Sequence, residues 1–74
     1  MKFDNYFKEF CDKYNYTGKI EYDKAKNENS IVISKDGDNA GLFLSKEELM
    51  GLSNRQIENL LNMLHIGFID QFHK

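Results

Sequence analysis

Cys11 is the only cysteine in the chain, and its thiol is the first group to consider for chemistry. A cysteine thiolate can serve as a nucleophile or as a redox switch. Here, however, Cys11 follows Phe7 and Phe10 at helical spacing and belongs to the same apolar stripe. Apolar surroundings disfavour the thiolate, so such a thiol behaves as a small hydrophobic side chain. We therefore interpret Cys11 as a core residue.

The histidines and the best-placed serines also have structural interpretations. His65 and His73 are separated by eight residues, which is not a usual chelating spacing, and no cysteine lies near them. We place His65 near the end of a helix and His73 in the tail. Ser45 and Ser53 each precede Glu or Gln by three positions, the pattern of a helix capping box. The sequence therefore predicts no catalytic residue and no cofactor, and we expect a protein that is not an enzyme.

The most specific motif is a segment with three spaced carboxylates, residues 36–47. In this segment, five residues match the calcium-loop pattern of EF-hand proteins: Asp36, Asp38, Gly41, Phe43 and Glu47. The segment thus resembles an EF-hand loop, and the resemblance implies a metal site at Asp36, Asp38 and Glu47. It departs from the pattern at Ala40, where a ligand is missing, and it follows a strand-like Ile-Val-Ile run where the family has a helix. The favoured alternative is a hairpin turn at Asp36, then a strand, then a helix cap.

The hydrophobic pattern predicts six elements in the order α-β-β-β-α-α. They are helix 2–15, strands 17–23, 30–34 and 40–44, a short helix 46–50, and a long helix from 54 to about 71. The first strand alternates Gly18, Ile20 and Tyr22 with charged residues, which predicts one buried face. Gly51 is expected to end the short helix in the left-handed conformation. The apolar stripe keeps its phase across Gly67, so we expect the long helix to continue through it.

These elements predict a single α+β domain over residues 1–74. Short connections make the three strands an antiparallel meander. Each long helix has one apolar stripe, so both are expected on the same face of the sheet, which gives a two-layer sandwich.

Several apolar residues are left over once the core is assigned. On the long helix, Met63, Ile66 and Ile69 lie off the main stripe. On the first helix, Tyr6 and Tyr14 lie at the stripe edges, and a further tyrosine follows directly, Tyr16. Tyrosine and methionine at a core edge are typical of protein interfaces. The alternative is a wide buried face within the domain itself.

Composition limits the function classes. The net charge is −2, and Lys19, Lys24, Lys26 and Lys35 alternate with acidic residues, so at most a weak nucleic-acid association is expected. A single cysteine cannot form an internal disulfide. No apolar run suggests a signal peptide or a membrane span, so we expect a cytoplasmic protein with no membrane partner. Lysine outnumbers arginine nine to one, which suggests a bacterial or phage origin.

The function predicted from the sequence is a non-catalytic interaction module. We expect a regulatory or inhibitory accessory protein that binds a protein partner or a second copy of itself. Its contact residues would be Met63, Ile66, Ile69 and the three tyrosines named above. The alternatives are a calcium-responsive protein using the 36–47 loop and a weak nucleic-acid-associated protein.

Overall fold

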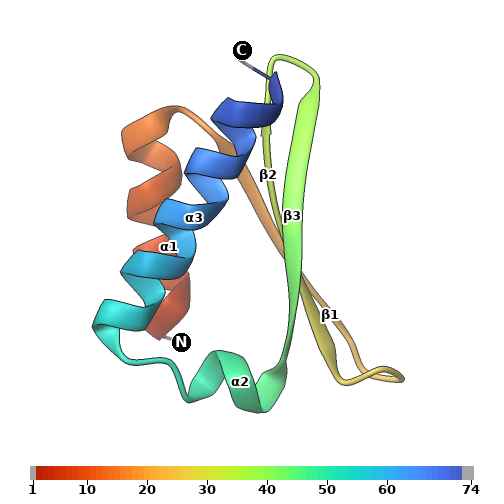
Figure 1. The fold of residues 1–74 in the computed structure, drawn as a ribbon. Coiled ribbons are helices and arrows are strands. Elements are labelled where there is room, and N and C mark those ends of the chain that lie inside the picture. The colour runs from red at the N-terminus through yellow and green to blue at the C-terminus, as the bar shows by residue number, and fades with distance from the viewer. Residues whose placement is uncertain (1, 73–74) are drawn as a thin grey trace.

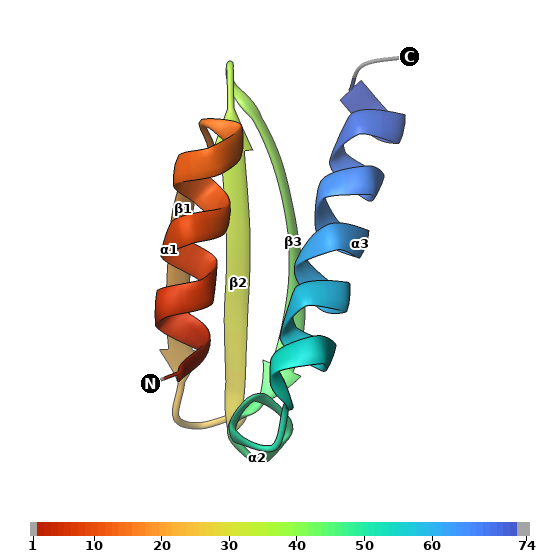
Figure 2. The same ribbon diagram turned by 90° about the vertical axis from the view of Figure 1, so that its left-hand side faces the viewer.

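Two long helices cover one face of a three-stranded antiparallel sheet in the computed structural model, which describes residues 2–72 (Figure 1). The elements in chain order are α1 (Lys2–Tyr14), β1 (Thr17–Asp23), β2 (Glu28–Lys35), β3 (Asp38–Ser45), α2 (Lys46–Met50) and α3 (Asn54–Phe72). Figure 2 shows α1 over the β1 side of the sheet and α3 over the β3 side, with β2 running between them. The predicted order α-β-β-β-α-α and the two-layer α+β arrangement are confirmed.

Helix α1 forms because its apolar residues recur at helical spacing and meet the sheet along one side. Its buried residues are Phe3, Phe7, Phe10 and Cys11. The residue after the helix is Asn15, whose φ of 60° lies in the left-handed region. The N–H of Tyr16 then donates to the carbonyl of Cys11 at 2.9 Å, which is the backbone pattern of a Schellman motif. The chain therefore turns directly from α1 into β1.

The hairpin between β2 and β3 closes on two residues, Asp36 and Gly37. Both have positive φ, 53° and 85°, and the flanking residues Lys35 and Asp38 are paired across the ladder. Such a turn matches the right-handed twist of the strands it joins. The predicted turn is thus confirmed, and β2 and β3 extend beyond their predicted ends on both sides.

The prediction of a buried face along β1 is wrong: none of the residues of this strand, 17–23, is buried. Gly18 lies against α1, where an added Cβ would be 2.6 Å from Cys11 Sγ. Ile20 is half-buried, but Tyr22 is 48% exposed. In Figure 1 the twisted β1–β2 hairpin extends away from the helices at this end. The helices therefore do not reach far enough to cover Tyr22.

Two capping boxes start α2 and α3, as predicted. Ser45 and Glu48 satisfy each other's backbone N–H groups, and Ser53 and Gln56 do the same. The predicted left-handed conformation of Gly51 is wrong. Its φ is −85°, because its N–H closes the last turn of α2 on Glu47 O at 3.0 Å without a left-handed residue.

Helix α3 continues through Gly67, as predicted. An added Cβ at Gly67 would meet nothing within 4 Å, so this glycine lies on the open side of the helix. The core lies between β2 and the two helices. Its most completely buried side chains are Phe3, Ile31, Ile33, Ile57 and Phe68.

Candidate functional site

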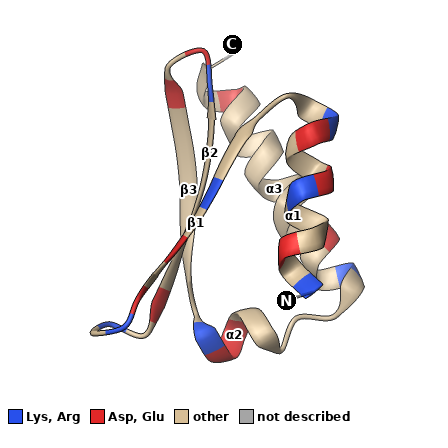
Figure 3. Ribbon diagram, turned by 180° about the vertical axis from the view of Figure 1, so that it is seen from behind, with Lys and Arg blue, Asp and Glu red and all other residues tan. Residues whose placement is uncertain are grey.

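The side of α3 that faces away from the sheet is apolar and open to solvent. Its opposite side is buried through Ile57, Leu61, Leu64 and Phe68. On the outward side Met63 is 70% exposed, Ile66 50% and Ile69 39%. Residues 59–69 include no Asp, Glu, Lys or Arg, and Figure 3 shows far fewer charged residues on α3 than on α1. We call the exposed set the α3 outer face: Asn59, Asn62, Met63, Ile66 and Ile69.

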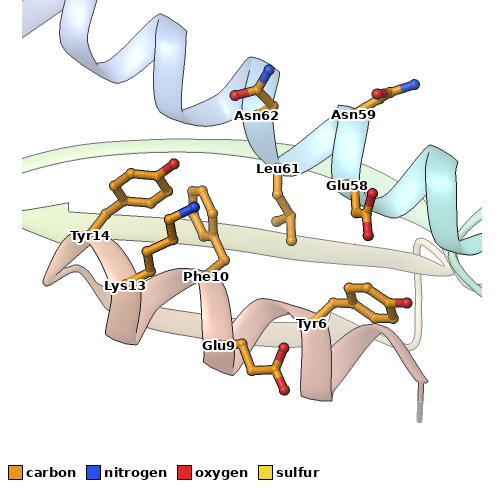
Figure 4. Close-up of a pocket in the computed structure, with 9 residues that line it drawn as sticks. All are labelled: Tyr6, Glu9, Phe10, Lys13, Tyr14, Glu58, Asn59, Leu61 and Asn62. Carbon is orange, nitrogen blue, oxygen red and sulfur yellow. The ribbon is translucent and has the colours of Figure 1, made fainter.

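A groove of about 490 Å³ between α1 and α3 borders this face (Figure 4). Phe10 and Leu61 supply its apolar floor. Its remaining lining is mixed in charge and polarity: Tyr6, Glu9, Lys13, Tyr14, Glu58, Asn59 and Asn62. Tyr6 and Tyr14 are half-buried here. These two tyrosines therefore share a groove with Asn59 and Asn62 of the α3 outer face, and their role in binding stays a prediction.

Tyr16 is a core residue, which corrects its predicted place on a contact surface. Only 8% of the residue is exposed. Its ring lies 5.7 Å from the ring of Phe10 and 5.0 Å from that of Phe68, measured between centroids. Its hydroxyl lies 2.8 Å from His65 Nδ1. The Schellman turn after α1 brings this side chain under α3, where it cannot meet a partner.

His65 joins three elements in an aromatic cluster that the sequence did not reveal. Its ring stacks on Tyr14 with centroids 3.8 Å apart. Lys35, at the end of β2, donates to the carbonyl oxygen of Tyr14 at 3.2 Å. Burial lowers the pKa of His65, and the nearby positive charges of Lys35 and Lys13 lower it further. A neutral imidazole can accept the hydrogen bond of the Tyr16 hydroxyl, whose own pKa is raised by burial.

One signal for this cluster was present in the sequence. His65 follows Leu61 by four residues, so it lies at the border of the buried stripe of α3. The neighbouring rings, Tyr14 stacked on His65 and Tyr16 edge-on to it, come from the other end of the chain. Their proximity depends on how α1 and α3 pack against each other, and the periodicity within one helix does not predict this packing.

The three carboxylates of the EF-hand-like loop do not come together. Asp36 lies in the turn before β3, whereas Glu47 lies in α2 beyond its far end. An eight-residue strand spans about 25 Å, so Asp36 and Glu47 cannot share a metal ion. Within residues 2–72 no three His, Cys, Asp or Glu side chains are close enough to hold one. The predicted metal site at Asp36, Asp38 and Glu47 is therefore wrong, because the segment between them is an extended strand.

Glu47 instead belongs to a polar link between the β1–β2 turn and α2. Asn27 donates from Nδ2 to Glu47 Oε2 at 2.7 Å, and the hydroxyl of Tyr22 donates to Asn27 Oδ1 at 2.9 Å. The hydrogen bond from Asn27 is the main cause that lowers the pKa of Glu47. This arrangement explains the carboxylate without a metal ion.

Cys11 and the serines lie where the sequence placed them. Cys11 is buried, and burial, together with the negative charge of Asp12, raises its pKa to about 11. Its thiol is therefore protonated at neutral pH and is a weak nucleophile. Ser45 and Ser53 are both held in capping boxes. His73 lies outside the described residues.

Comparisons of the chain with models of protein families, with curated protein sequences and with solved protein structures found no match. Among the helices of residues 2–72, none has the length and apolar character needed to cross a bilayer. The function must therefore be argued from the residues of this chain.

Proposed function

We propose that the protein is a non-catalytic interaction module that binds a protein surface through the α3 outer face. The observation that carries the proposal is the exposure of Met63, Ile66 and Ile69 along a helix whose opposite side already fills the core. A surface helix of a small domain ordinarily places charged and polar residues on its solvent side. This helix departs from that pattern between Met63 and Ile69, over slightly less than two turns.

The α3 outer face leaves apolar side-chain area in contact with water. Fully burying a Met or Ile side chain stabilises a protein or a complex by roughly 1.5–3 kcal/mol. Met63, Ile66 and Ile69 are each partly exposed, so a partner can still gain a substantial part of this free energy. Methionine also adapts its shape to a partner and is enriched in interfaces. The three residues together provide an apolar patch on one face of the helix.

The non-catalytic part of the proposal rests on the environment of the reactive side chains. Cys11 is buried and protonated at neutral pH, and Ser45 and Ser53 cap helices. His65 is engaged by the Tyr16 hydroxyl and stacks on Tyr14. Each of these groups already has a structural role within the domain.

Binding through one apolar face supports a regulatory or inhibitory role, in which the protein acts by occupying a surface of its partner. No comparable observation supports nucleic-acid binding. Lys19 pairs with Glu21 at 2.9 Å, and Lys35 lies at the opposite end of the sheet from the Lys24–Lys26 turn. A cytoplasmic location and a bacterial or phage origin stay predictions.

Site-specific photo-crosslinking tests the proposal. A photoreactive amino acid replaces Ile66 in the full chain, and the matched control replaces Lys8, which is exposed on the charged side of α1. Both proteins are irradiated in extracts of the native host, and adducts are identified by mass spectrometry. We expect a discrete protein adduct at position 66, either a second copy of the chain or a different protein.

The control defines the negative result. If positions 66 and 8 give the same weak, heterogeneous adducts, the α3 outer face is not a binding surface and the proposal fails. An adduct at position 66 that disappears when Met63→Asp is added supports the proposal, because the variant places a charge on the same face without touching the core.

A further inference from the structure

We infer that the occupant of the α3 outer face is a second copy of this chain, packed antiparallel across a two-fold axis that passes between Asn62 and Met63. The inference rests on the proposed function, since it names the partner of the same face. Two features of α3 point to it: the placement of its terminal charges and the chemistry of its centre.

Arg55 and Asp70 lie at opposite ends of the α3 outer face. Both residues are exposed, and they are 15 positions apart in the sequence. At about 3.6 residues per turn this spacing is slightly more than four turns. Both residues therefore lie on the same side of the helix as Ile66. In an antiparallel pair with its axis between Asn62 and Met63, Arg55 lies opposite the partner's Asp70. The symmetry produces this contact twice. A parallel pair would instead place like charges opposite each other.

These two charges are unfavourable within their own helix. The N-terminal end of a helix carries partial positive charge and the C-terminal end partial negative charge. Arg55 lies in the first turn of α3 and Asp70 in the last, so each has the wrong sign for its end, and no acidic residue in the first turn or basic residue in the last turn compensates. An antiparallel neighbour reverses this, because it brings the opposite helix end and the opposite charge beside each of them.

The centre of the face is compatible with its own copy. Asn62 lies next to the axis, close to Asn62 of the partner subunit, and its amide group can pair with the identical group because it both donates and accepts hydrogen bonds. Met63 and Ile66 supply the apolar contact. The net charge of the whole chain is only −2, so repulsion between copies is small.

The size of the face sets the expected strength. Nineteen residues of helix are about 28 Å long, and a single helix pair buries less than the roughly 800 Å² per partner of a standard interface. We therefore expect a weak, reversible dimer that is populated at high protein concentration. A charge at its centre should abolish it.

Sedimentation velocity over a concentration series tests the inference with charge-swap variants. The unchanged protein is expected to self-associate, and Ile66→Asp is expected to be monomeric throughout. Arg55→Glu and Asp70→Arg are each expected to weaken the dimer about tenfold, since two attractive contacts become repulsive. The double variant should recover the original affinity. An equimolar mixture of the two single variants should recover it as well, because each subunit then supplies the opposite charges to the other.

Two controls separate association from folding. Lys8→Glu makes the same charge change as Arg55→Glu on α1 and should leave the affinity unchanged. At concentrations where only monomer is present, Arg55→Glu and Asp70→Arg should be as thermally stable as the unchanged protein or more so, because each now suits its helix end. Weaker association together with undiminished stability supports the inference.

A strictly monomeric protein, or single variants that the swap and the mixture do not rescue, overturns the inference. If crosslinking at position 66 then captures a different protein, the proposed function stands without the homodimer. If neither self-association nor a specific adduct is found, both fail.

Discussion

Helices α1 and α3 perform the same structural task and differ in what they present to solvent. Each buries four residues against the sheet. Of the 13 residues of α1, six are Asp, Glu or Lys, whereas only three of the 19 residues of α3 are charged. Each helix already supplies buried residues to the core, so core packing does not explain the apolar outer face of α3. The contrast supports the proposal that this face makes a contact outside the domain.

Two glycines, one packed against α1 and one within α3, differ in the same way in what surrounds them. Gly18 lies under α1, where an added Cβ would be 2.6 Å from Cys11 Sγ and 2.7 Å from the Phe7 ring. Gly67 lies on the open side of α3 and has nothing within 4 Å. One glycine is required by close packing, and the other has no packing role within the domain.

The largest expected effect distinguishes the two sides of α3. Phe68→Ala removes a ring that is 1% exposed and should lower the free energy of unfolding by about 3–5 kcal/mol. Ile66→Ala, two residues away, should change it by less than about 0.5 kcal/mol. Urea unfolding by circular dichroism, at concentrations where the protein is monomeric, measures both. Similar losses would contradict the distinction, because they would mean that the outer face is packed within the domain.

The next effect concerns the contact between β1 and α1. Gly18→Ala forces the new methyl group against Phe7 and Cys11, which should cost about 1–3 kcal/mol of stability. Lys19→Ala, on the next residue and 70% exposed in its side chain, should cost less than about 0.5 kcal/mol. Thermal unfolding compares the two variants. If Gly18→Ala is neutral, α1 lies farther from the sheet than described.

A smaller and opposite effect is expected on α3. Gly67→Ala places a methyl group in open space on a helical residue, so the stability should rise by up to about 1 kcal/mol. The melting temperature at low concentration measures the gain. A loss of stability would show that α3 is interrupted at this residue or that another group occupies the space.

The smallest effect is the pH dependence of the His65 cluster, which links the two helices. The pKa of His65 is lowered in the folded protein from its ordinary 6.5, so the unfolded chain binds more protons as the pH falls through that value. The contribution of His65 to the free energy of unfolding is therefore fully present above pH 6.5 and decreases as the pH falls toward the lowered pKa. His65→Gln should flatten this part of the profile. Urea midpoints measured between about pH 8 and 5 test it, and an unchanged slope would contradict the assignment.

Features that depend on one element were readable in the sequence. The capping boxes at Ser45 and Ser53, the turn at Asp36, and the passage of α3 through Gly67 each depend on neighbours a few residues away. The position of Met63 and Ile66 off the buried stripe also followed from helical phase, whereas the structure decided between an exposed and a wide buried face. The spacing of residues is sufficient to predict these features because the interacting groups are close together along the chain.

Features that depend on how elements pack were decided by the tertiary structure. Tyr16 was expected at a surface, yet the Schellman turn and the cover of α3 bury it beside His65. Tyr22 was expected on a buried face, yet the twist of the hairpin carries it beyond the helices. Asp36 and Glu47 matched a calcium loop by spacing alone, but the extended β3 holds them apart.

The sequence by itself determined the order of the elements, the buried stripes of the two long helices and the absence of charge along the middle of α3, because these follow from the residue types and the helical period. It also placed Cys11 in the core. The tertiary structure decided which side chains from distant segments meet, since that depends on the twist of the sheet and on where the helices end. It therefore removed Tyr16 from the candidate contact surface and left Met63, Ile66 and Ile69 of the α3 outer face exposed to solvent.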